Sequence, residues 1–408
     1  MANTFKFGNG NWAVKDGYAL AYNDENNNFK PLPFDFTRAS SATTLNRQGL
    51  IETVGSGKPR IDFLDNTDGH LLLEPSRTNL AQRSEEFDNS YWLKSLTSIT
   101  ANQAISPDGT QTADTITKNA DFGALYKSGI SISSGSNYTL SIFVKKSTTN
   151  FFSLRQASGS YDVRKQFNLT TKEVSNGTGG NQTGFVSSEI KEYANDWLKI
   201  SIVCTSNGTS LTIGFYSGKV GESTNNGDSF IWGAQLEAGS YATSYIPTEG
   251  SSVTRVAETA NGAGSSTVFN DSEGVLFAEI TALANDSTNR IISVSDGSGN
   301  NRVLIKYDNS SNTIEASLTD GGLDQASLSH SYTITNTAKI AFKYKANDFA
   351  LWVNGSEVDT DSNGTTPSGL DTLNFDNGSG GSDFYGKVKD LKVYNTALTD
   401  TELQNLTS

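Results

Sequence analysis

Hydrophobic residues occupy every second position along most of the chain after about residue 135. In the segment YTLSIFVKK, for example, Tyr138, Leu140, Ile142 and Val144 fall on one face. Successive side chains of a β-strand point to opposite sides of the sheet, so a period of two is typical of half-buried strands. The same pattern recurs in LKISIVCT, LTIGFY and FIWGAQLE, and again further along in RVLIKYD, KIAFKYK and FALWVNG. The alternation therefore predicts an all-β chain with two successive sandwiches.

Short turn signals lie between these segments. Asn-Gly or Asp-Gly pairs begin at Asp108, Asn207, Asp296, Asp320 and Asn354. These residues tolerate the positive φ angles that tight hairpin turns require, so the strands that they join are expected to be antiparallel. The clearest hairpin is FALWVNGSEVDT, in which Asn354 and Gly355 form the turn.

One short helix is expected at the C-terminal end, in ALTDTELQNLTS. Thr399 can accept a hydrogen bond from the backbone N–H of Glu402, and Glu402 can accept one from the N–H of Thr399, which is the capping-box arrangement. Leu398 can pack on Leu403 across the first turn of this helix. We expect Leu398, Leu403 and Leu406 to lie against the second sandwich.

Changes in Gly, Ser and Pro content suggest how the chain is divided. The stretch TEGSSVTRVAETANGAGSST is poor in large apolar residues, as a linker is. Pro31, Pro33 and Pro59 favour extended backbone in the N-terminal segment, which has too few strands for a sandwich of its own. We therefore expect an extended attachment and oligomerisation segment over residues 1–80, a jelly-roll-like sandwich over 81–249, a linker over 250–267 and a second sandwich over 268–408.

The charge of the chain limits its partners. The formal net charge is −13 and no cluster of Lys and Arg is visible, so we expect neither a nucleic-acid partner nor binding to anionic membranes. The opening MANTFKFGNGNWAVKDG lacks the regions of a secretion signal, and no segment approaches about 18 uninterrupted apolar residues. Cys204 is the only cysteine, which excludes an intrachain disulfide, and we expect it to be a small core residue.

Several motifs resemble those of a known family. The segments FDFTRASSATTLNRQGLIETV, PRIDF and LLLEPSRTNL together resemble the opening module of many tailed-phage virion proteins, namely head-spike, head-fibre or tail-fibre subunits. SFIWGAQLEAGSYATSYIPTEGSSVTR is similar to the end of the carbohydrate-binding-module-like jelly roll that commonly follows in those proteins. The last 140 or so residues, with KVKDLKVYNTALTDTELQNL, resemble a concanavalin A-like, laminin-G-type sandwich.

This resemblance implies a structural subunit on the outer surface of a phage particle, assembled in the host cytoplasm. It implies a homo-oligomer, a trimer by analogy with phage fibres, that attaches to other virion proteins through the N-terminal segment. The two sandwiches would then be displayed and could bind glycans of a host or of its environment. None of these motifs is a catalytic signature.

The sequence offers few candidates for catalytic residues. The two histidines, His70 and His330, lie in polar, turn-like surroundings, and no G-x-S-x-G motif accompanies them. Two carboxylates suffice for glycoside hydrolysis, so a polysaccharide-degrading tail spike, a glycosidase or a lyase, is the alternative function. The chain lacks the E-x-D-x-x-E arrangement of concanavalin-like glucanases. We therefore expect no enzymatic activity and no cofactor other than a structural metal ion.

Structural calcium is the metal to consider, because loops rich in Asp and Asn oxygens can hold it. One such loop is DNTDG, with Asp65 and Asp68, and another is STNNGD, with Asn226 and Asp228. Neither has EF-hand spacing. Ordinary turns closed by Asn and Asp side chains are the alternative interpretation.

Glycan binding requires an exposed aromatic ring beside polar groups that hold hydroxyls. Phe122, Tyr126 and Tyr216 are the candidates, since Tyr216 lies opposite the apolar face of its strand and Phe122 lies in the polar stretch NADFGALY. A structural role is the alternative for each of them. Three tryptophans within strand patterns are expected in the core instead: Trp197, Trp232 and Trp352.

Overall fold

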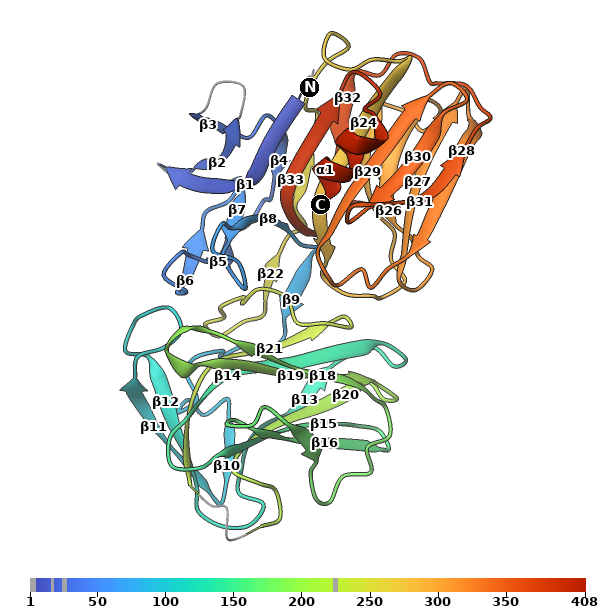
Figure 1. The fold of residues 1–408 in the computed structure, drawn as a ribbon. Coiled ribbons are helices and arrows are strands. Elements are labelled where there is room, and N and C mark those ends of the chain that lie inside the picture. The colour runs from blue at the N-terminus through green and yellow to red at the C-terminus, as the bar shows by residue number, and fades with distance from the viewer. Residues whose placement is uncertain (1–4, 16–17, 24–27, 223–226) are drawn as a thin grey trace. The chain divides into compact units, whose positions relative to one another are not determined.

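A computed structural model describes residues 5–15, 18–23, 28–222 and 227–408. The chain forms two compact units, each of which is a β-sandwich (Figure 1). Unit 1 comprises residues 1–41, 54–75 and 256–408, and unit 2 comprises residues 42–53 and 76–255. The expected all-β class with antiparallel sheets is confirmed.

Unit 2 contains two six-stranded antiparallel sheets that pack face to face around one core. One sheet has the order β10 (Leu93–Ser95), β13 (Ala124–Ser131), β20 (Ser210–Ser217), β15 (Phe151–Ser158), β16 (Tyr161–Asn168), β17 (Val174–Asn176). The other has the order β11 (Thr97–Ala104), β12 (Ala113–Lys118), β21 (Asp228–Ala238), β14 (Asn137–Lys146), β19 (Leu198–Thr205), β18 (Phe185–Glu192).

The alternating residues of these strands fill the core of unit 2, as predicted. Leu140, Ile142 and Val144 are fully buried between the sheets. Cys204 is buried in β19, and burial raises the pKa of its thiol to about 12, so it is an unreactive core residue. Trp197 is buried too. The smaller elements of this unit are β5 (Ala42–Leu45) with β6 (Ile51–Val54), β9 (Arg77–Asn79) with β22 (Val253–Arg255), and a 3₁₀ turn at Ala194–Asp196.

The WGAQLE motif lies in β21 and stabilises the loop that follows this strand. Gly233 has a φ of 64°, and a Cβ atom there would lie 2.9 Å from the Phe143 ring, so glycine is required at this irregular point of β21. The buried Glu237 accepts hydrogen bonds from the N–H (3.0 Å) and hydroxyl (2.7 Å) of Thr243. Gln235 accepts one from the N–H of Ile246 (2.7 Å). The WGAQLE motif thus has a structural role in β21 and in the loop that follows it.

Unit 1 is a sandwich of a ten-stranded and a five-stranded antiparallel sheet. The larger sheet has the order β3 (Asn28–Pro31), β2 (Tyr18–Asn23), β1 (Phe5–Lys15), β33 (Gly386–Tyr394), β24 (Glu273–Ala282), β29 (Ala338–Lys345), β30 (Phe349–Val353), β31 (Ser356–Asp361), with β8 (His70–Leu73) also on β33 and β7 (Arg60–Asp62) on β8. The smaller has the order β28 (Leu323–Ser331), β27 (Thr313–Asp320), β26 (Arg302–Tyr307), β25 (Arg290–Ser295), β32 (Thr372–Asn374). A two-stranded ladder joins β4 (Asp35–Thr37) to β23 (Thr259–Asn261).

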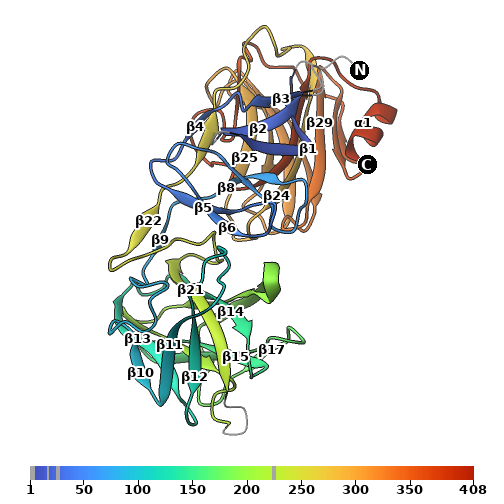
Figure 2. The same cartoon turned by 90° about the vertical axis from the view of Figure 1, so that its left-hand side faces the viewer.

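The N-terminal segment differs from the expected separate extended body. Strand β1 pairs with β33, so that β1, β2 and β3 extend a sheet of the C-terminal sandwich (Figure 2). The indole N–H of the buried Trp12 donates to the carbonyl of Lys389 (3.1 Å). The pairing joins residues almost 380 positions apart, so no local pattern announces it. Attachment of this segment to other virion proteins stays a prediction.

A buried ion network holds the separate segments of unit 1 together. The Glu258 carboxylate accepts hydrogen bonds from Arg38 Nη1 (2.6 Å) and Arg60 Nε (2.8 Å) and pairs with Arg60 Nη2. Arg60 Nη2 also lies 2.9 Å from Glu74 Oε2. Burial alone would lower the pKa of Arg60, but Glu258 and Glu74 raise it above its ordinary value. Arg38, Arg60 and Glu74 belong to the motifs FDFTRASSAT, PRIDF and LLLEPS, and their role here is structural.

Residues 250–267, expected to be a linker, are partly built into the two units. Glu258 is the centre of the network described above, and Arg255 is buried in unit 2. Arg255 Nη1 donates to the hydroxyl of Ser244 (2.8 Å). The low content of large apolar residues is offset by buried, paired charges, which composition alone does not reveal.

The C-terminal hairpin and helix agree with the sequence prediction. Asn354 and Gly355, with φ of 48° and 82°, connect β30 to β31. Helix α1 (Asp400–Thr407) carries the capping box of Thr399 and Glu402. Helix α1 lies against the larger sheet (Figure 1). Leu398, just before the helix, and Leu403 within it are buried in a cluster with Trp352, and Leu406 packs on this cluster. In the described part of the chain, no helix is long and apolar enough to span a membrane.

Candidate functional site

One outer face of unit 2 brings aromatic and charged side chains into a row across five strands. Leu93 lies opposite Tyr126, Tyr126 opposite Gly214, Gly214 opposite Arg155, and Arg155 opposite Arg164. Directly opposed residues of antiparallel strands point to the same side of the sheet. Their chain neighbours belong to the core: Leu125, Phe215, Leu154 and Val163. The row therefore faces outward.

Two arginines in this row share one carboxylate. Arg155 donates to Asp162 through Nε (2.8 Å) and Nη2 (3.0 Å). Arg164 does the same through Nε (3.2 Å) and Nη2 (2.8 Å), and its Nη1 donates to the carbonyl of Thr178 (3.1 Å). Burial acts to raise the pKa of Asp162, but the two arginines outweigh it and lower the pKa. The carboxylate therefore stays ionised and the cluster carries one net positive charge.

These side chains are partly open to solvent. The exposed fractions are 25% for Arg155, 23% for Asp162 and 13% for Arg164. A guanidinium has five N–H donors, and Asp162 accepts only two from each arginine. The cluster is held in one geometry yet keeps donors for a ligand.

The three aromatic residues predicted for glycan binding lie in this part of unit 2, in different roles. Tyr126 is half-buried and packs against the cluster that contains Tyr216. Phe122 is 48% exposed, and its ring lies over Gly221, where a Cβ atom would come within 3.2 Å of it. Tyr216, by contrast, is buried because its ring lies across Gly214, which has no side chain to displace it. Tyr216 therefore supports the surface from beneath.

We call Phe122, Tyr126, Arg155, Asp162 and Arg164 the aromatic–arginine face. The prediction from sequence did not include its three charged members. A signal was available in YDVRKQF, because Asp162 and Arg164 alternate with the buried residues of β16. Alternating charges opposite an apolar face are ordinary on exposed strands, so only the pairing of β15 with β16 makes these charges stand out.

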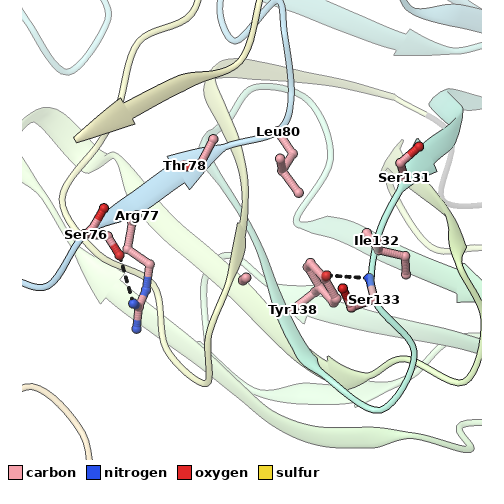
Figure 3. Close-up of a pocket in the computed structure, with 9 residues that line it drawn as sticks. Ser76, Arg77, Thr78, Leu80, Ser131, Ile132, Ser133 and Tyr138 are labelled. Carbon is pink, nitrogen blue, oxygen red and sulfur yellow. Dashed lines mark hydrogen bonds between the residues drawn. The ribbon is translucent and has the colours of Figure 1, made fainter. Parts of the chain in front are cut away.

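An open pocket of about 560 Å³ lies elsewhere on unit 2 (Figure 3). Leu80, Ile132 and Ala238 supply its apolar surface, and its hydroxyl-bearing residues are Ser76, Thr78, Ser131, Ser133 and Tyr138. The Tyr138 hydroxyl accepts a hydrogen bond from the N–H of Ser133 (2.8 Å). Arg77 Nη1 donates to the carbonyl of Ser76 (3.1 Å), and its Nε lies 3.8 Å from Glu237. The Tyr138 hydroxyl and the Arg77 side chain are thus both in contact with other polar groups of the protein.

The residues proposed for calcium lie apart. Asp65 and Asp68 are exposed in unit 1, where Asn66 closes a turn by accepting the N–H of Asp68 (2.8 Å). Asp228 begins β21 in unit 2, and Asn226 lies outside the described residues. No group of three or more His, Cys, Asp or Glu side chains suited to a metal ion occurs among residues 5–15, 18–23, 28–222 and 227–408. Calcium binding stays a prediction.

Part of unit 1 is similar to a known protein family. Residues 263–404 match the family described as the concanavalin A-like lectin/glucanases superfamily. This range includes β24 to β33 and most of α1, so the laminin-G-like sandwich expected at the C-terminal end is present. No curated protein matches the sequence.

Solved structures show only distant likeness. The CBM40 of the Ruminococcus gnavus IT-sialidase, also solved with alpha2,3 sialyllactose, has 17% identity over 36% of this chain and 94% of its own, with a TM-score of 0.31. Domains LG4-5 of the mouse laminin alpha1 chain have 8% identity over 80% of this chain and 94% of theirs, with a TM-score of 0.25. Trypanosoma rangeli sialidase has 10% identity over 72% of this chain and 60% of its own, with a TM-score of 0.29. These low scores carry no conclusion about function.

Proposed function

We propose that this chain is a non-enzymatic, glycan-binding subunit on the surface of a bacteriophage particle. The observation that carries the binding role is the aromatic–arginine face of unit 2. Aromatic rings offer apolar contact to the C–H face of a sugar, while fixed guanidinium donors hold its oxygens. The resemblance of the N-terminal motifs to tailed-phage virion proteins supports the location, and a lectin-type sandwich in unit 1 is consistent with it.

The charge of the face favours an acidic glycan. Two arginines and one carboxylate leave a net positive charge on a chain whose formal charge is −13. Arginine suits carboxylate recognition because its planar fork can donate two parallel hydrogen bonds. A sugar with a carboxylate, such as a uronic or sialic acid unit of a surface polysaccharide, is therefore the preferred ligand class.

Glycan-array binding followed by titration tests this function. We expect acidic glycans to bind, and Arg155→Ala and Tyr126→Ala each to weaken binding about tenfold, which corresponds to about 1.4 kcal/mol. Lys146→Ala is the matched control, because Lys146 is exposed on β14 in the other sheet of unit 2. Absence of binding across the array, or equal binding by all variants, would remove the role of this face.

Three further measurements test the location of the chain, its oligomeric state and the absence of enzymatic activity. Antibody-labelled electron microscopy of phage particles should place the chain on their outer surface, and mass photometry should show an oligomer, with a trimer expected. Incubation with host polysaccharide should yield no new reducing ends and no unsaturated products. Release of such products would instead support the depolymerase alternative.

A further inference from the structure

Unit 1 contains a partly enclosed pocket of about 210 Å³ on the outer side of its larger sheet. Its base comes from the adjacent strands β24 and β33, through Glu279, Thr281, Lys387 and Lys389. The loop between β7 and β8 closes one side with Leu64, Asp65 and Asn66, and Thr335 and Thr337 close another. One water molecule needs about 10–15 Å³ of such space, so the pocket has room for a small polar ligand.

Donors and acceptors are balanced around this pocket. Lys389 Nζ lies 3.2 Å from Glu279 Oε1, so these two charges neutralise each other. Lys387 precedes Lys389 by two positions on the same strand, and Asp65 supplies a second carboxylate from the loop. The hydroxyls of Thr281 and Thr337 lie 2.9 Å apart, which leaves one of their two protons available for a further acceptor.

His70 contributes a buried ring nitrogen to this pocket. It lines the pocket but is only 2% exposed, and its Nε2 has no hydrogen-bond partner among the described residues. The nearest carboxylate oxygen, Asp62 Oδ1, lies 3.6 Å away, beyond a good hydrogen bond. Buried polar atoms are normally paired, so an unpaired nitrogen that lines a pocket is a candidate partner for a ligand in that pocket.

The imidazole is neutral at physiological pH. Burial lowers the pKa of His70 to about 3, Lys387 and Lys389 act in the same direction, and Asp62 opposes them. A neutral ring can accept one hydrogen bond and donate another, as hydroxyl recognition requires. The ammonium groups of Lys387 and Lys389 line this pocket and repel a cation. The pocket is therefore a poor place for the calcium ion considered at Asp65.

We propose that this pocket binds a single neutral sugar residue, with Lys387, Glu279 and the threonine hydroxyls holding its hydroxyl groups beside His70. Each sugar hydroxyl both donates and accepts, and the pocket lining includes both ammonium donors and carboxylate acceptors. The site lies in unit 1 and is independent of the aromatic–arginine face, which favours an acidic ligand. The chain would thus recognise two different sugar chemistries in its two sandwiches.

The two histidines make a direct test possible. In protein labelled with ¹⁵N-histidine, only His70 and His330 give ring signals, and the variant His330→Gln assigns them. We expect glucose, galactose or N-acetylglucosamine, added up to about 20 mM, to shift the His70 signals, because dissociation constants near about 1 mM are usual for such small ligands. Glucuronate and inorganic phosphate are the charged probes, and neither should shift them at equal concentration.

Variants then locate the effect. Thr335 is exposed at the rim, so Thr335→Trp should fill the pocket and abolish the shift while the melting temperature stays unchanged. Lys387→Gln should weaken binding at least fivefold, whereas Lys345→Gln, at a lysine outside the pocket that pairs with Glu273, should not. Arg155→Ala should leave the shift intact, which separates this site from the proposed function.

Three results would overturn the proposal. The first is that none of the three neutral sugars shifts the His70 signals. The second is that a shift persists at full size in Thr335→Trp. The third is that only glucuronate or phosphate produces a shift, which would make the pocket a general anion site.

Discussion

The two sandwiches of this chain are held together in different ways. Both units have an apolar core, and unit 2 is built almost entirely from the continuous stretch 76–255. Unit 1 gathers three separate stretches, and four buried charged residues join them: Arg38, Arg60, Glu74 and Glu258. Local hairpins can form a sandwich from hydrophobic burial alone, whereas remote segments need contacts that tolerate only one arrangement. Buried charges meet that need, because an unpaired partner is strongly unfavourable.

The two proposed binding surfaces also differ in how exposed they are. The aromatic–arginine face of unit 2 lies open on a sheet, with its charges partly exposed. In unit 1 the loop between β7 and β8, which belongs to the N-terminal segment, covers part of a sheet and forms one side of a partly enclosed pocket. A segment added from far along the chain therefore supplies a wall that a simple sandwich lacks.

The largest expected effect follows from removing Arg60, which pairs with both glutamates of the buried ion network. Arg60→Ala leaves Glu74 and Glu258 buried without their main partner, so unit 1 should lose about 3–5 kcal/mol of unfolding free energy. Hydrogen exchange followed by mass spectrometry measures this for each unit separately. Peptides of unit 2 should be unaffected.

The matched control is a surface ion pair in unit 2. Lys172 and Glu192 are 43% and 65% exposed, so Glu192→Gln should change stability by no more than about 0.5 kcal/mol. If Arg60→Ala costs as little as this control, the contrast between the two units is wrong.

A smaller effect should appear as unit 1 is acidified. The pKa of His70 is about 3 in the folded protein and about 6.5 when unfolded, so the unfolded chain takes up a proton first as pH falls. Stability from this group is complete above pH 6.5 and is lost as pH falls toward 3. Between about pH 7 and pH 5 the loss should be about 2 kcal/mol.

Denaturant unfolding of the parent chain and of His70→Gln at both pH values measures this loss. The difference between the two proteins isolates the histidine, since other groups titrate in both. Equal pH dependence in the two proteins would show that His70 is not held neutral.

The smallest expected effect is a gain, not a loss, of stability on acidification, and it concerns unit 2. Burial raises the pKa of Asp114 to about 6, although the N–H groups of Asn102 (2.9 Å) and Phe87 (3.2 Å) donate to it and act against the shift. The folded protein therefore binds the proton first, and unit 2 should gain stability as pH falls through 6. After allowance for solvent screening the gain is at most about 1 kcal/mol.

The variant Asp114→Asn should abolish that gain. Hydrogen exchange in unit 2 at pH 7 and pH 5 provides the measurement. A loss of stability of unit 2 over the same range, equal in both proteins, would contradict the assignment to Asp114.

Features with a local signal were predictable from the sequence. The alternation of Leu140, Ile142 and Val144, the turn at Asn354 and the cap at Thr399 all depend on residues close together in the chain, and all are confirmed. The family likeness of the C-terminal sandwich also agrees with the match over residues 263–404.

Features that depend on remote pairing were not predictable. Arg38 and Glu258 are charged and look like surface residues until strands far apart in sequence enclose them. Tyr216 looks exposed by alternation, but Gly214 on the same face lets its ring lie flat and become buried. The pocket near His70 requires the N-terminal loop to meet β33, which no local pattern encodes.

The points where the chain leaves and re-enters unit 1 are adjacent. It departs at Pro75 and returns at Val256, and the N–H of Glu258 donates to the carbonyl of Glu74 (3.1 Å). Residues 76–255 therefore behave as an insertion whose two ends are tied together by the host sandwich. A different domain inserted at this point would leave the chain path of unit 1 unbroken, provided that residues 42–53, which also belong to unit 2, were accommodated. Such a replacement would keep the buried ion network of unit 1, because all four of its charged residues lie outside the inserted stretch.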